Sequence, residues 1–236
     1  MQPDSIYMSI RVICFDLDDT LWPVDSVIRH AENALRQWFY RYYPRIPQNF
    51  SISDMQAMRQ ELLREQPELY ANLHELRRIN IKQVVNAVGY DEAIIEPALD
   101  IFDNARHKVK PYHDVIPALE RLYKNYTLCA LTNGTADVKR IDKLARFFTV
   151  SLRAGDVGHA KPHPALFETA CQRCEVEPEQ VLHIGDHVDS DVLGALQAGM
   201  HAIWMNRKKQ DWNAEHQPHA IIHSLEELDN VLKQGL

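Results

Sequence analysis

One segment of the chain sets three carboxylates directly after four apolar residues: Val12-Ile13-Cys14-Phe15-Asp16-Leu17-Asp18-Asp19-Thr20. The apolar residues predict a strand that is buried on both faces, as the parallel strands of α/β proteins are. A strand that ends in Asp-x-Asp-x-Thr brings acidic groups to the carboxyl edge of a sheet, where open α/β folds bind their ligands. On one loop, Asp16 and Asp18 repel each other unless a cation lies between them. A helix cap or a turn explains a single Asp but explains three within four positions poorly, so we interpret the segment as a functional site.

The composition is typical of a globular protein, with 45% hydrophobic and 25% charged residues. A chain of 236 residues can bury one substantial core and has room for a sizeable insertion or a second small domain. The formal net charge is -7, and the sequence has no long Lys/Arg run. We therefore expect no nucleic-acid-binding surface, because such surfaces neutralise phosphates with basic residues. An acidic protein that handles an anionic substrate usually needs a metal.

No stretch has the apolar length needed to cross a bilayer, and residues 1–11 lack the apolar run of a signal peptide. We therefore expect a cytoplasmic protein that does not bind membranes. The sequence has too few cysteines for a disulfide framework in a chain of this size. Cys171 and Cys174 form a C-x-x-C motif, but no second Cys/His pair lies nearby at ligand spacing. We interpret all four cysteines as reduced thiols that are buried or half-buried: Cys14, Cys129, Cys171 and Cys174.

A long helical segment follows the acidic loop. The spacing of apolar residues predicts a first helix over residues 25–42, and Ser51 or Ser53 can cap a second. A third helix is predicted over about residues 68–88 and a fourth over about 91–107. Four helices with no strand between them indicate a separate helical unit, inserted just after the acidic loop, that is a candidate lid.

Two clusters in this helical unit have both a structural and a functional interpretation. The aromatic cluster could stack on a heterocyclic substrate, although aromatic residues at helical spacing more often pack in a core: Trp38, Phe39, Tyr40, Tyr42 and Tyr43. The basic cluster is interpreted as a solvated helix face in preference to a substrate clamp: Arg77, Arg78 and Lys82.

From Pro111 onwards the sequence alternates between helix and strand patterns. Apolar runs predict strands over residues 127–131, 150–152, 181–184, 201–205 and 220–223. Helical patterns lie before, between and after them: over about residues 114–123 and 138–147, in a helix opened by residues 158–164, in a helix closed by residues 195–198 with Gly199 as its stop, and over 225–232. This alternation predicts an α/β fold with a doubly wound, Rossmann-like parallel sheet and helices on both faces.

Polar residues follow two of these strands, and a further connection carries a lysine. Thr132-Asn133-Gly134 comes after the strand over 127–131, Asp186 and Asp191 come after the strand over 181–184, and Lys161 lies between them in the sequence. If these strands neighbour the first, one edge of the sheet holds four carboxylates, a hydroxyl and one ammonium group. Oxygen ligands of this kind suit Mg²⁺ beside a substrate phosphate. Because neither a P-loop nor a G-x-S-x-G elbow is present, those two site types are excluded on motif grounds.

Four segments, in this order, resemble the motifs of the haloacid dehalogenase (HAD) superfamily: Asp16-Leu17-Asp18-Asp19-Thr20, Thr132-Asn133-Gly134, Lys161-Pro162, and Gly185-Asp186 with Asp191 five residues after Asp186. The resemblance covers nearly the whole chain. It implies a HAD core domain of residues 1–22 and 109–236, with an inserted α-helical cap domain of residues 23–108 similar to the caps of subfamily I. More distantly, the chain resembles the bacterial branch that dephosphorylates flavin mononucleotide and related riboflavin-pathway phosphates.

The resemblance also implies catalytic roles. Asp16 would be the nucleophile that attacks phosphorus and becomes an aspartyl phosphate. Asp18 would protonate the leaving alcohol and later deprotonate the attacking water. Thr132 would hydrogen-bond a phosphoryl oxygen, and Lys161 would offset the negative charge of the phosphoryl group and of Asp16.

Two sets of ligands follow from the same resemblance. Mg²⁺ would be bound by Asp16, by the backbone carbonyl of Asp18 and by Asp186, while Asp191 would hold Lys161 or a metal-bound water. The substrate phosphate would be bound by side chains and backbone N–H groups of Leu17, Asp18, Thr132, Asn133, Gly134 and Lys161.

Asp18 bears on the type of reaction. Dehalogenating members of the superfamily lack an acid/base Asp two positions after the nucleophile, because a halide leaving group needs no proton. We therefore expect a Mg²⁺-dependent phosphatase of a small phosphomonoester, with a phosphomutase or a non-catalytic binding protein as alternatives. Flavin mononucleotide, other riboflavin-pathway phosphates, sugar phosphates, phosphoglycolate and nucleoside monophosphates are all open as substrates, and the oligomeric state is open too.

Overall fold

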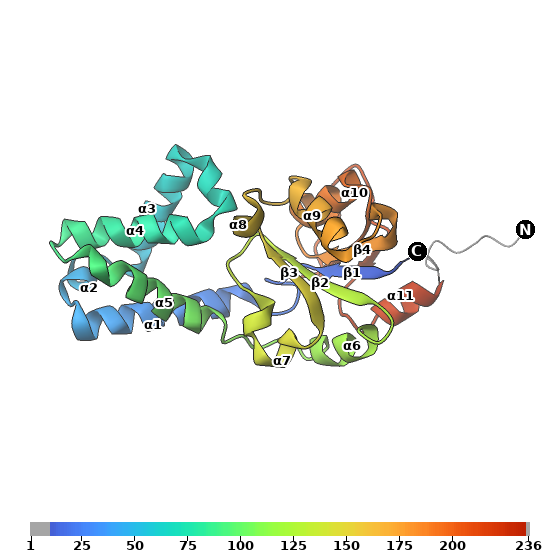
Figure 1. Ribbon diagram of the computed structural model, residues 1–236, viewed down its shortest axis with the longest axis horizontal. Coiled ribbons are helices and arrows are strands. Elements are labelled where there is room, and N and C mark those ends of the chain that lie inside the picture. Colours follow the sequence, from blue (N-terminus) through green and yellow to red (C-terminus); the bar gives the residue numbers. More distant parts are fainter. Residues whose placement is uncertain (1–9, 235–236) are drawn as a thin grey trace, which may run out of the picture. The chain divides into compact units, whose positions relative to one another are not determined.

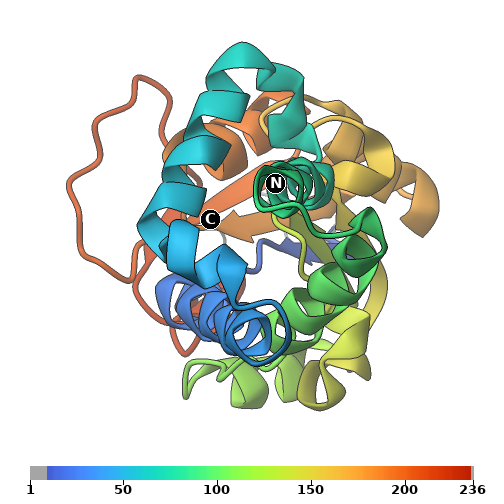
Figure 2. The same cartoon turned by 90° about the vertical axis from the view of Figure 1, so that its left-hand side faces the viewer.

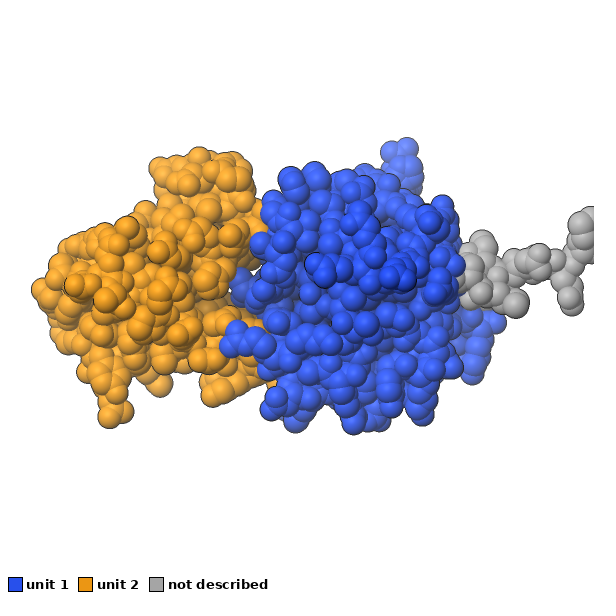
Figure 3. Space-filling view, viewed as in Figure 1, with its two compact units in different colours: residues 1–23, 110–236 blue, residues 24–109 orange. Residues whose placement is uncertain are grey.

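The computed structural model describes residues 10–234 (Figure 1). The chain divides into two compact units: unit 1 comprises residues 1–23 and 110–236, and unit 2 comprises residues 24–109 (Figure 3). The expectation that residues 1–11 are not a signal peptide falls largely on residues 1–9, which lie outside the described residues.

Unit 1 is built on a six-stranded parallel sheet with the strand order β3-β2-β1-β4-β5-β6. Its strands are β1 (Val12–Phe15), β2 (Thr127–Thr132), β3 (Phe148–Arg153), β4 (Val181–Gly185), β5 (His201–Met205) and β6 (Ala220–Ile222). Its helices are α6 (Val115–Leu122), α7 (Asp142–Ala145), α8 (Ala154–Val157), α9 (Ala165–Cys174), α10 (Gly194–Gln197) and α11 (Leu228–Gln234). In Figure 1, α9 and α10 lie on one face of the sheet and α6, α7 and α11 on the other, which confirms the doubly wound α/β fold.

The register of the central strands determines where the polar residues that follow them lie. Phe15 of β1 is paired with Ala130 of β2 and with Ile184 of β4, and β1 is buried along its whole length. Because the three strands are parallel neighbours, their carboxyl ends meet at one edge of the sheet. The adjacency that the sequence argument required is therefore present.

Two helices of unit 1 differ from the sequence expectation. The helix expected over residues 138–147 is reduced to a 3₁₀ turn (Val138–Arg140) and the short α7, because Asp137 caps the turn and Ile141 is extended. The helix expected after β4, ending at residues 195–198, begins as a π-helical turn, Val188–Leu193, that leads into α10. The chain between β5 and β6, residues 206–219, forms a long loop on the outside of this unit (Figure 2).

Unit 2 consists only of helices among the residues described: α1 (Val24–Tyr42), α2 (Arg45–Asn49), α3 (Ile52–Glu65), α4 (Leu73–Ala87) and α5 (Ile95–Arg106). Ser51 caps α3 in a capping box with Asp54, as one of the two expected alternatives. The helix expected over residues 68–88 is split into a 3₁₀ turn (Pro67–Ala71) and α4, because Asn72 leaves the helical conformation and its side chain accepts a hydrogen bond from the backbone N–H of Glu75. A sequence signal for this break was present in Asn72 itself, a preferred N-cap residue.

The aromatic cluster of unit 2 is mainly a packing cluster. Trp38 contacts the rings of Phe39, Tyr42 and Tyr43, and Phe39 is buried in the core of the unit. Tyr40 and Tyr42 expose about half of their surface, at 52% and 55%. Packing in the core of the unit therefore explains the buried members of the cluster, whereas Tyr40 and Tyr42 remain largely exposed.

The interpretation of the basic cluster as a solvated face is wrong for Arg77. Its guanidinium lies 3.4 Å from the centre of the Phe102 ring and 3.9 Å from a carboxylate oxygen of Glu32, which is itself buried. Burial lowers the pKa of Arg77 to about 9. Arg78 and Lys82, by contrast, are exposed and form surface ion pairs. A single sequence does not reveal that the side chain of Arg77 turns inward, because this orientation depends on α1 and α5 packing against α4.

The cysteines behave as expected from the sequence. All four are free thiols; Cys14, Cys129 and Cys171 are buried and Cys174 is half-buried. Within residues 10–234, no helix is both long enough and apolar enough to span a membrane.

Candidate active site

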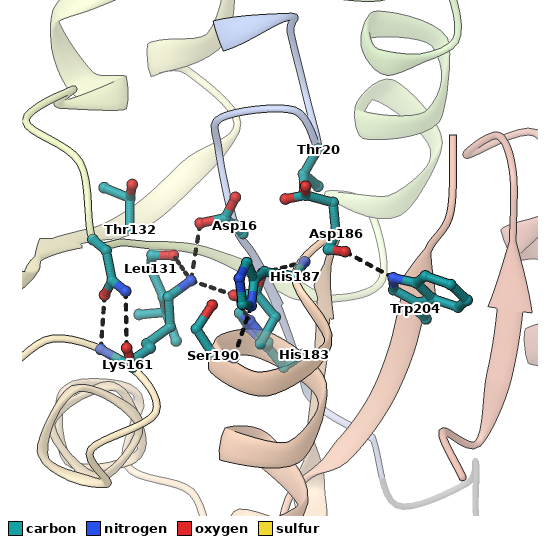
Figure 4. A network of polar contacts seen from close by, with 12 residues as sticks. Asp16, Thr20, Leu131, Thr132, Lys161, His183, Asp186, His187, Ser190 and Trp204 are labelled. Atoms are coloured by element: carbon teal, nitrogen blue, oxygen red, sulfur yellow. Dashed lines mark hydrogen bonds and ion pairs between the residues drawn. The ribbon is translucent and has the colours of Figure 1, made fainter. Parts of the chain in front are cut away.

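The carboxyl edge of the central strands gathers the acidic residues and the lysine of the sequence motifs (Figure 4). Asp16 follows β1 and Asp186 follows β4, while Asp191 lies in the π-helical turn and Lys161 in the segment before α9. Carboxylate oxygens of Asp16, Asp186 and Asp191 all lie within 4.8 Å of one another. Figure 4 shows Asp16 between Lys161 on one side and Asp186 on the other.

Lys161 is the cation of this site and is only 2% exposed. Its Nζ donates to Asp191 Oδ1 at 2.5 Å, to the carbonyl oxygen of Leu131 at 2.7 Å and to Asp16 Oδ1 at 2.9 Å. Burial alone lowers the pKa of Lys161, but the Asp16 and Asp191 carboxylates outweigh burial and raise it. Lys161 therefore stays protonated, with each of its three N–H groups used.

Asn133 fixes the backbone of Lys161. Its Oδ1 accepts from the Lys161 N–H at 2.7 Å, and its Nδ2 donates to the Lys161 carbonyl at 2.9 Å. A primary amide can satisfy both groups of one peptide segment in this way. The turn after β2 thus positions the lysine, and Asn133 acts here through its side chain, whereas the sequence argument considered the backbone at this position.

The two carboxylates that share Lys161 are in different electrostatic environments. Burial raises the pKa of Asp16 well above its usual value, and the Asp191 and Asp186 carboxylates add to the rise although Lys161 lowers it. Burial also acts to raise the pKa of Asp191, but the charge of Lys161, together with hydrogen bonds from Lys161 and His183, outweighs burial and lowers it. Asp191 is thus held as a carboxylate, whereas the negative charge on Asp16 is only partly compensated.

Asp186 carries further uncompensated charge. Burial, followed by repulsion from Asp191 and Asp19, raises its pKa to about 7. Its backbone carbonyl accepts from Trp204 Nε1 at 2.7 Å, which fixes the start of the loop after β4. The donor set of Asp16 and Asp186 consists of oxygens that lack sufficient positive partners, and it therefore fits a hard divalent cation such as Mg²⁺.

The remaining motif residues lie beside this cluster. Asp18 is half-buried, and its Oδ1 accepts from the indole Nε1–H of Trp22 at 2.8 Å. Thr132 is buried, and its Oγ1 accepts from the Gly134 N–H at 2.9 Å. The Gly134 N–H is thus already hydrogen-bonded to Thr132, where the sequence argument expected it to bind phosphate directly. The bond orients the hydroxyl, whose own hydrogen can still be donated to a ligand oxygen.

Sequence reasoning missed His183, which lies in the middle of β4 with its side chain buried. Its Nε2 lies 3.1 Å from Asp191 Oδ1, the oxygen that also accepts from Lys161. Burial lowers the pKa of His183, so the neutral ring donates to Asp191. The available signal was one polar residue within the apolar run Val181-Leu182-His183-Ile184, since a buried polar side chain needs a partner.

Gly185 is a second residue whose role depends on the folded site. A Cβ at this position would lie 2.3 Å from Asp191 Cγ and 2.5 Å from Asp191 Cβ. Asp191 cannot easily move away, because Lys161, His183 and the His187 N–H all bind its carboxylate. Only glycine therefore fits at the end of β4.

We expect Gly185→Ala to lower the free energy of unfolding by about 1 to 3 kcal/mol, the usual cost of overpacking a closed site, and to displace Asp191 from Lys161. Urea unfolding of the variant and the wild type measures the loss. A variant with unchanged stability would show that the loop after β4 can move away from the added methyl group.

The parallel sheet, its strand order and the acidic groups at its carboxyl edge define a Rossmann-like α/β protein with a polar ligand site. The chain belongs to the haloacid dehalogenase-like hydrolase family, whose model matches residues 10–199.

Similar proteins include both phosphatases and dehalogenases. The chain is 29% identical over 231 residues to the 5-amino-6-(5-phospho-D-ribitylamino)uracil phosphatase YigB of Escherichia coli strain K12. The aligned region covers 94% of this chain and 96% of YigB. It is 30% identical over 207 residues to a glyceraldehyde 3-phosphate phosphatase of Methanopyrus kandleri, with 85% of each protein covered. Among solved structures, a 2-haloacid dehalogenase from Pseudomonas syringae pv. Tomato DC3000 superposes with a TM-score of 0.88 at 38% identity, covering 95% of this chain and 99% of that one.

Proposed function

We propose that the protein is a Mg²⁺-dependent phosphatase that hydrolyses a small phosphomonoester through a phosphorylated Asp16. The observation that carries this proposal is the position of Asp16: its carboxylate is buried, bound by Lys161 and close to Asp186 and Asp191. A carboxylate in this environment is held in place but incompletely neutralised. Such a group can attack an electrophile that arrives together with a cation.

In the proposed reaction, a carboxylate oxygen of Asp16 attacks phosphorus and the bond from phosphorus to the ester oxygen breaks. Asp18, in its protonated form, gives its proton to the leaving alkoxide. Water then attacks the phosphorus of the aspartyl phosphate while Asp18 accepts a proton, and inorganic phosphate leaves with Asp16 regenerated. Thr132 donates its hydroxyl hydrogen to a phosphoryl oxygen, and Lys161 stabilises the negative charge on Asp16 and on the phosphoryl group.

We assign the metal to Asp16, Asp186 and the backbone carbonyl of Asp18, with Asp191 as the support of Lys161. When bound, Mg²⁺ would neutralise charge on the phosphoryl oxygens and on the two carboxylates. The hydrogen bonds from Lys161, His183 and His187 to Asp191 support its assignment as a positioning residue.

Removing divalent cations with EDTA is expected to abolish phosphate release, and Mg²⁺ is expected to restore it. Because a cation relieves the repulsion among the carboxylates, Mg²⁺ should also raise the unfolding temperature of the wild type. We expect Asp186→Asn to lose most of this increase, which thermal unfolding with and without Mg²⁺ measures independently of activity. If Mg²⁺ raised the unfolding temperature equally in the wild type and in Asp186→Asn, Asp186 would not be a metal ligand.

We further propose that unit 2 is the cap domain that determines the substrate. The likeness to YigB favours a ribitylaminouracil phosphate, and the likeness to the Methanopyrus kandleri phosphatase favours a short sugar phosphate. Flavin mononucleotide and other riboflavin-pathway phosphates stay candidates from the resemblance of the sequence motifs. Both classes therefore belong in any substrate panel, together with phosphoglycolate and nucleoside monophosphates.

Dehalogenation is the second candidate, because the chain is 38% identical to a solved protein that is named a 2-haloacid dehalogenase. The presence of Asp18, held by Trp22, favours phosphoryl transfer: an alkoxide leaving group requires a proton, whereas a halide does not.

The test is a panel of phosphomonoesters and 2-haloacids incubated with the wild type, with Mg²⁺ or with EDTA. We expect Mg²⁺-dependent release of phosphate from at least one phosphomonoester and no release of halide. Halide release without phosphate release would replace the proposal with dehalogenation. An isomerised sugar phosphate without free phosphate would replace it with a phosphomutase, and no turnover of any compound would favour a binding role.

A further inference from the structure

The side chain of Trp22 contacts Asp18 directly, although it carries no group that can transfer a proton in the proposed reaction. Trp22 is fully buried, at 0% exposure, and its Nε1–H donates to Asp18 Oδ1 at 2.8 Å. The indole hydrogens of Trp204 and Trp212 go instead to the backbone carbonyls of Asp186 and Ala214. Any carbonyl would satisfy a buried indole N–H, so the use of a carboxylate at Trp22 calls for a separate explanation.

The loop between Asp18 and Trp22 is built to bring these two side chains together. The Leu21 N–H donates to the Leu17 carbonyl at 2.8 Å, and the Asp19 N–H donates to the Trp22 carbonyl at 2.7 Å. Asp19 adopts a positive φ of 58°, a left-handed conformation that costs a non-glycine residue free energy. The backbone therefore accepts some strain to fold Trp22 back onto Asp18.

The rest of unit 1 holds this loop in place. The Thr20 carbonyl accepts from Arg207 Nε at 3.0 Å, and the Leu21 carbonyl accepts from the Tyr112 N–H at 3.0 Å. An indole that is fixed by packing and by its backbone can direct a short carboxylate side chain, because the hydrogen bond selects one rotamer of that side chain and one of its oxygens.

We propose that Trp22 is a positioning residue for Asp18, an inference that rests on the proposed function. The indole engages Oδ1, and the proton that moves between Asp18 and the leaving alcohol is carried by Oδ2. Trp22 thereby sets the direction from which Asp18 approaches the ester oxygen. A small misplacement of a proton donor is enough to slow the step that it assists.

The test is Trp22→Phe, which keeps a buried ring and removes the indole hydrogen. With enzyme in excess, the rate of alcohol release in a single turnover isolates the first chemical step. We expect this rate to fall about tenfold to a hundredfold for an alkyl phosphate. For p-nitrophenyl phosphate, whose leaving group needs little protonation, we expect a much smaller fall.

Two further variants separate positioning from a purely structural role. Trp212→Phe also removes an indole hydrogen, but one that Ala214 accepts, and we expect it to leave the ratio of alkyl to aryl rates unchanged. In an Asp18→Asn background, Trp22→Phe should cause no further loss, because its effect acts through Asp18. If the Phe variant does not fold, benzothienylalanine at position 22, which replaces the N–H with sulfur in the same ring shape, allows the same comparison.

The outcomes distinguish this inference from the function beneath it. The role of Trp22 is refuted if the wild type is active and Trp22→Phe lowers the alkyl and aryl rates equally, both in the wild type and in the Asp18→Asn background. It is also refuted if Trp22→Phe lowers neither rate. Either result leaves the proposed phosphatase function in place. A wild type that turns over neither phosphomonoester, while binding Mg²⁺ as judged by thermal unfolding, refutes the proposed function and this inference with it.

Discussion

Asp16→Asn is expected to reduce phosphate release by at least about a thousandfold, because an amide oxygen cannot form the covalent intermediate. The substitution keeps the size of the side chain and an acceptor for Lys161, which donates to Asp16 Oδ1 in the wild type. A steady-state assay on the best phosphomonoester of the panel, with Mg²⁺, measures the loss. Asp142→Asn is a suitable control, because Asp142 is exposed at the start of α7.

The same variant should be at least as stable as the wild type when Mg²⁺ is removed. Burial raises the pKa of Asp16 well above its usual value, so the ionised carboxylate destabilises the folded state relative to the unfolded chain. This destabilisation is present where Asp16 is ionised and disappears as the pH falls through its raised pKa. Asn removes the charge and with it this cost. If Asp16→Asn unfolded at a lower temperature than the wild type in EDTA, its loss of activity could come from unfolding. That result would contradict the assignment of Asp16 as a destabilising, catalytic carboxylate.

Lys161→Met is expected to remove activity and stability together. The substitution leaves Asp16 and Asp191 buried without the ammonium group that they share. Breaking a buried ion pair by removing one partner typically costs about 3 to 5 kcal/mol. We expect a loss of unfolding free energy of about this size, measured by urea unfolding at neutral pH in EDTA.

A matched control is available in the same unit. Lys143 is exposed on α7, and Lys143→Met should change the unfolding free energy by less than about 0.5 kcal/mol. If Lys161→Met were as stable as Lys143→Met, the buried carboxylates would have to be protonated or otherwise neutralised, and the electrostatic account of the site would be wrong.

The fold could be predicted from the sequence because its signals are local. The run Val12–Phe15 is apolar without interruption, and the later runs 127–131 and 181–184 repeat this pattern between helical segments. Such runs are typical of parallel strands that are covered on both faces. These patterns do not determine the strand order, so the adjacency of the three strands could not be predicted from them.

The candidate site could be predicted only in part. Asp16, Lys161, Asp186 and Asp191 come together because each directly follows a buried strand or lies in a connection at the same edge. His183 escaped notice because its partner, Asp191, lies eight residues away in a turn whose π-helical form no propensity signals. Trp22 escaped notice because its contact with Asp18 depends on the positive φ of Asp19.

Charge explains why these residues depend on one another. The site concentrates carboxylates around one buried ammonium group, and the Asp191 end of the cluster is satisfied by protein donors. The Asp16 and Asp186 end is not satisfied to the same degree, which is why the pKa values of both carboxyl groups are raised. An arrangement of this kind favours a cation and an electrophilic phosphoryl group at the same end.

The most direct measurement is to look for the phosphoryl group on the enzyme. Wild type and Asp16→Asn are mixed with substrate that is labelled in its phosphoryl group, quenched in acid within the first turnover, and digested for peptide mapping by mass spectrometry. We expect label on the wild-type peptide that contains Asp16 and none on the variant. Label on another residue, or rapid phosphate release with no labelled protein at any quench time, would contradict the central claim that Asp16 is the nucleophile.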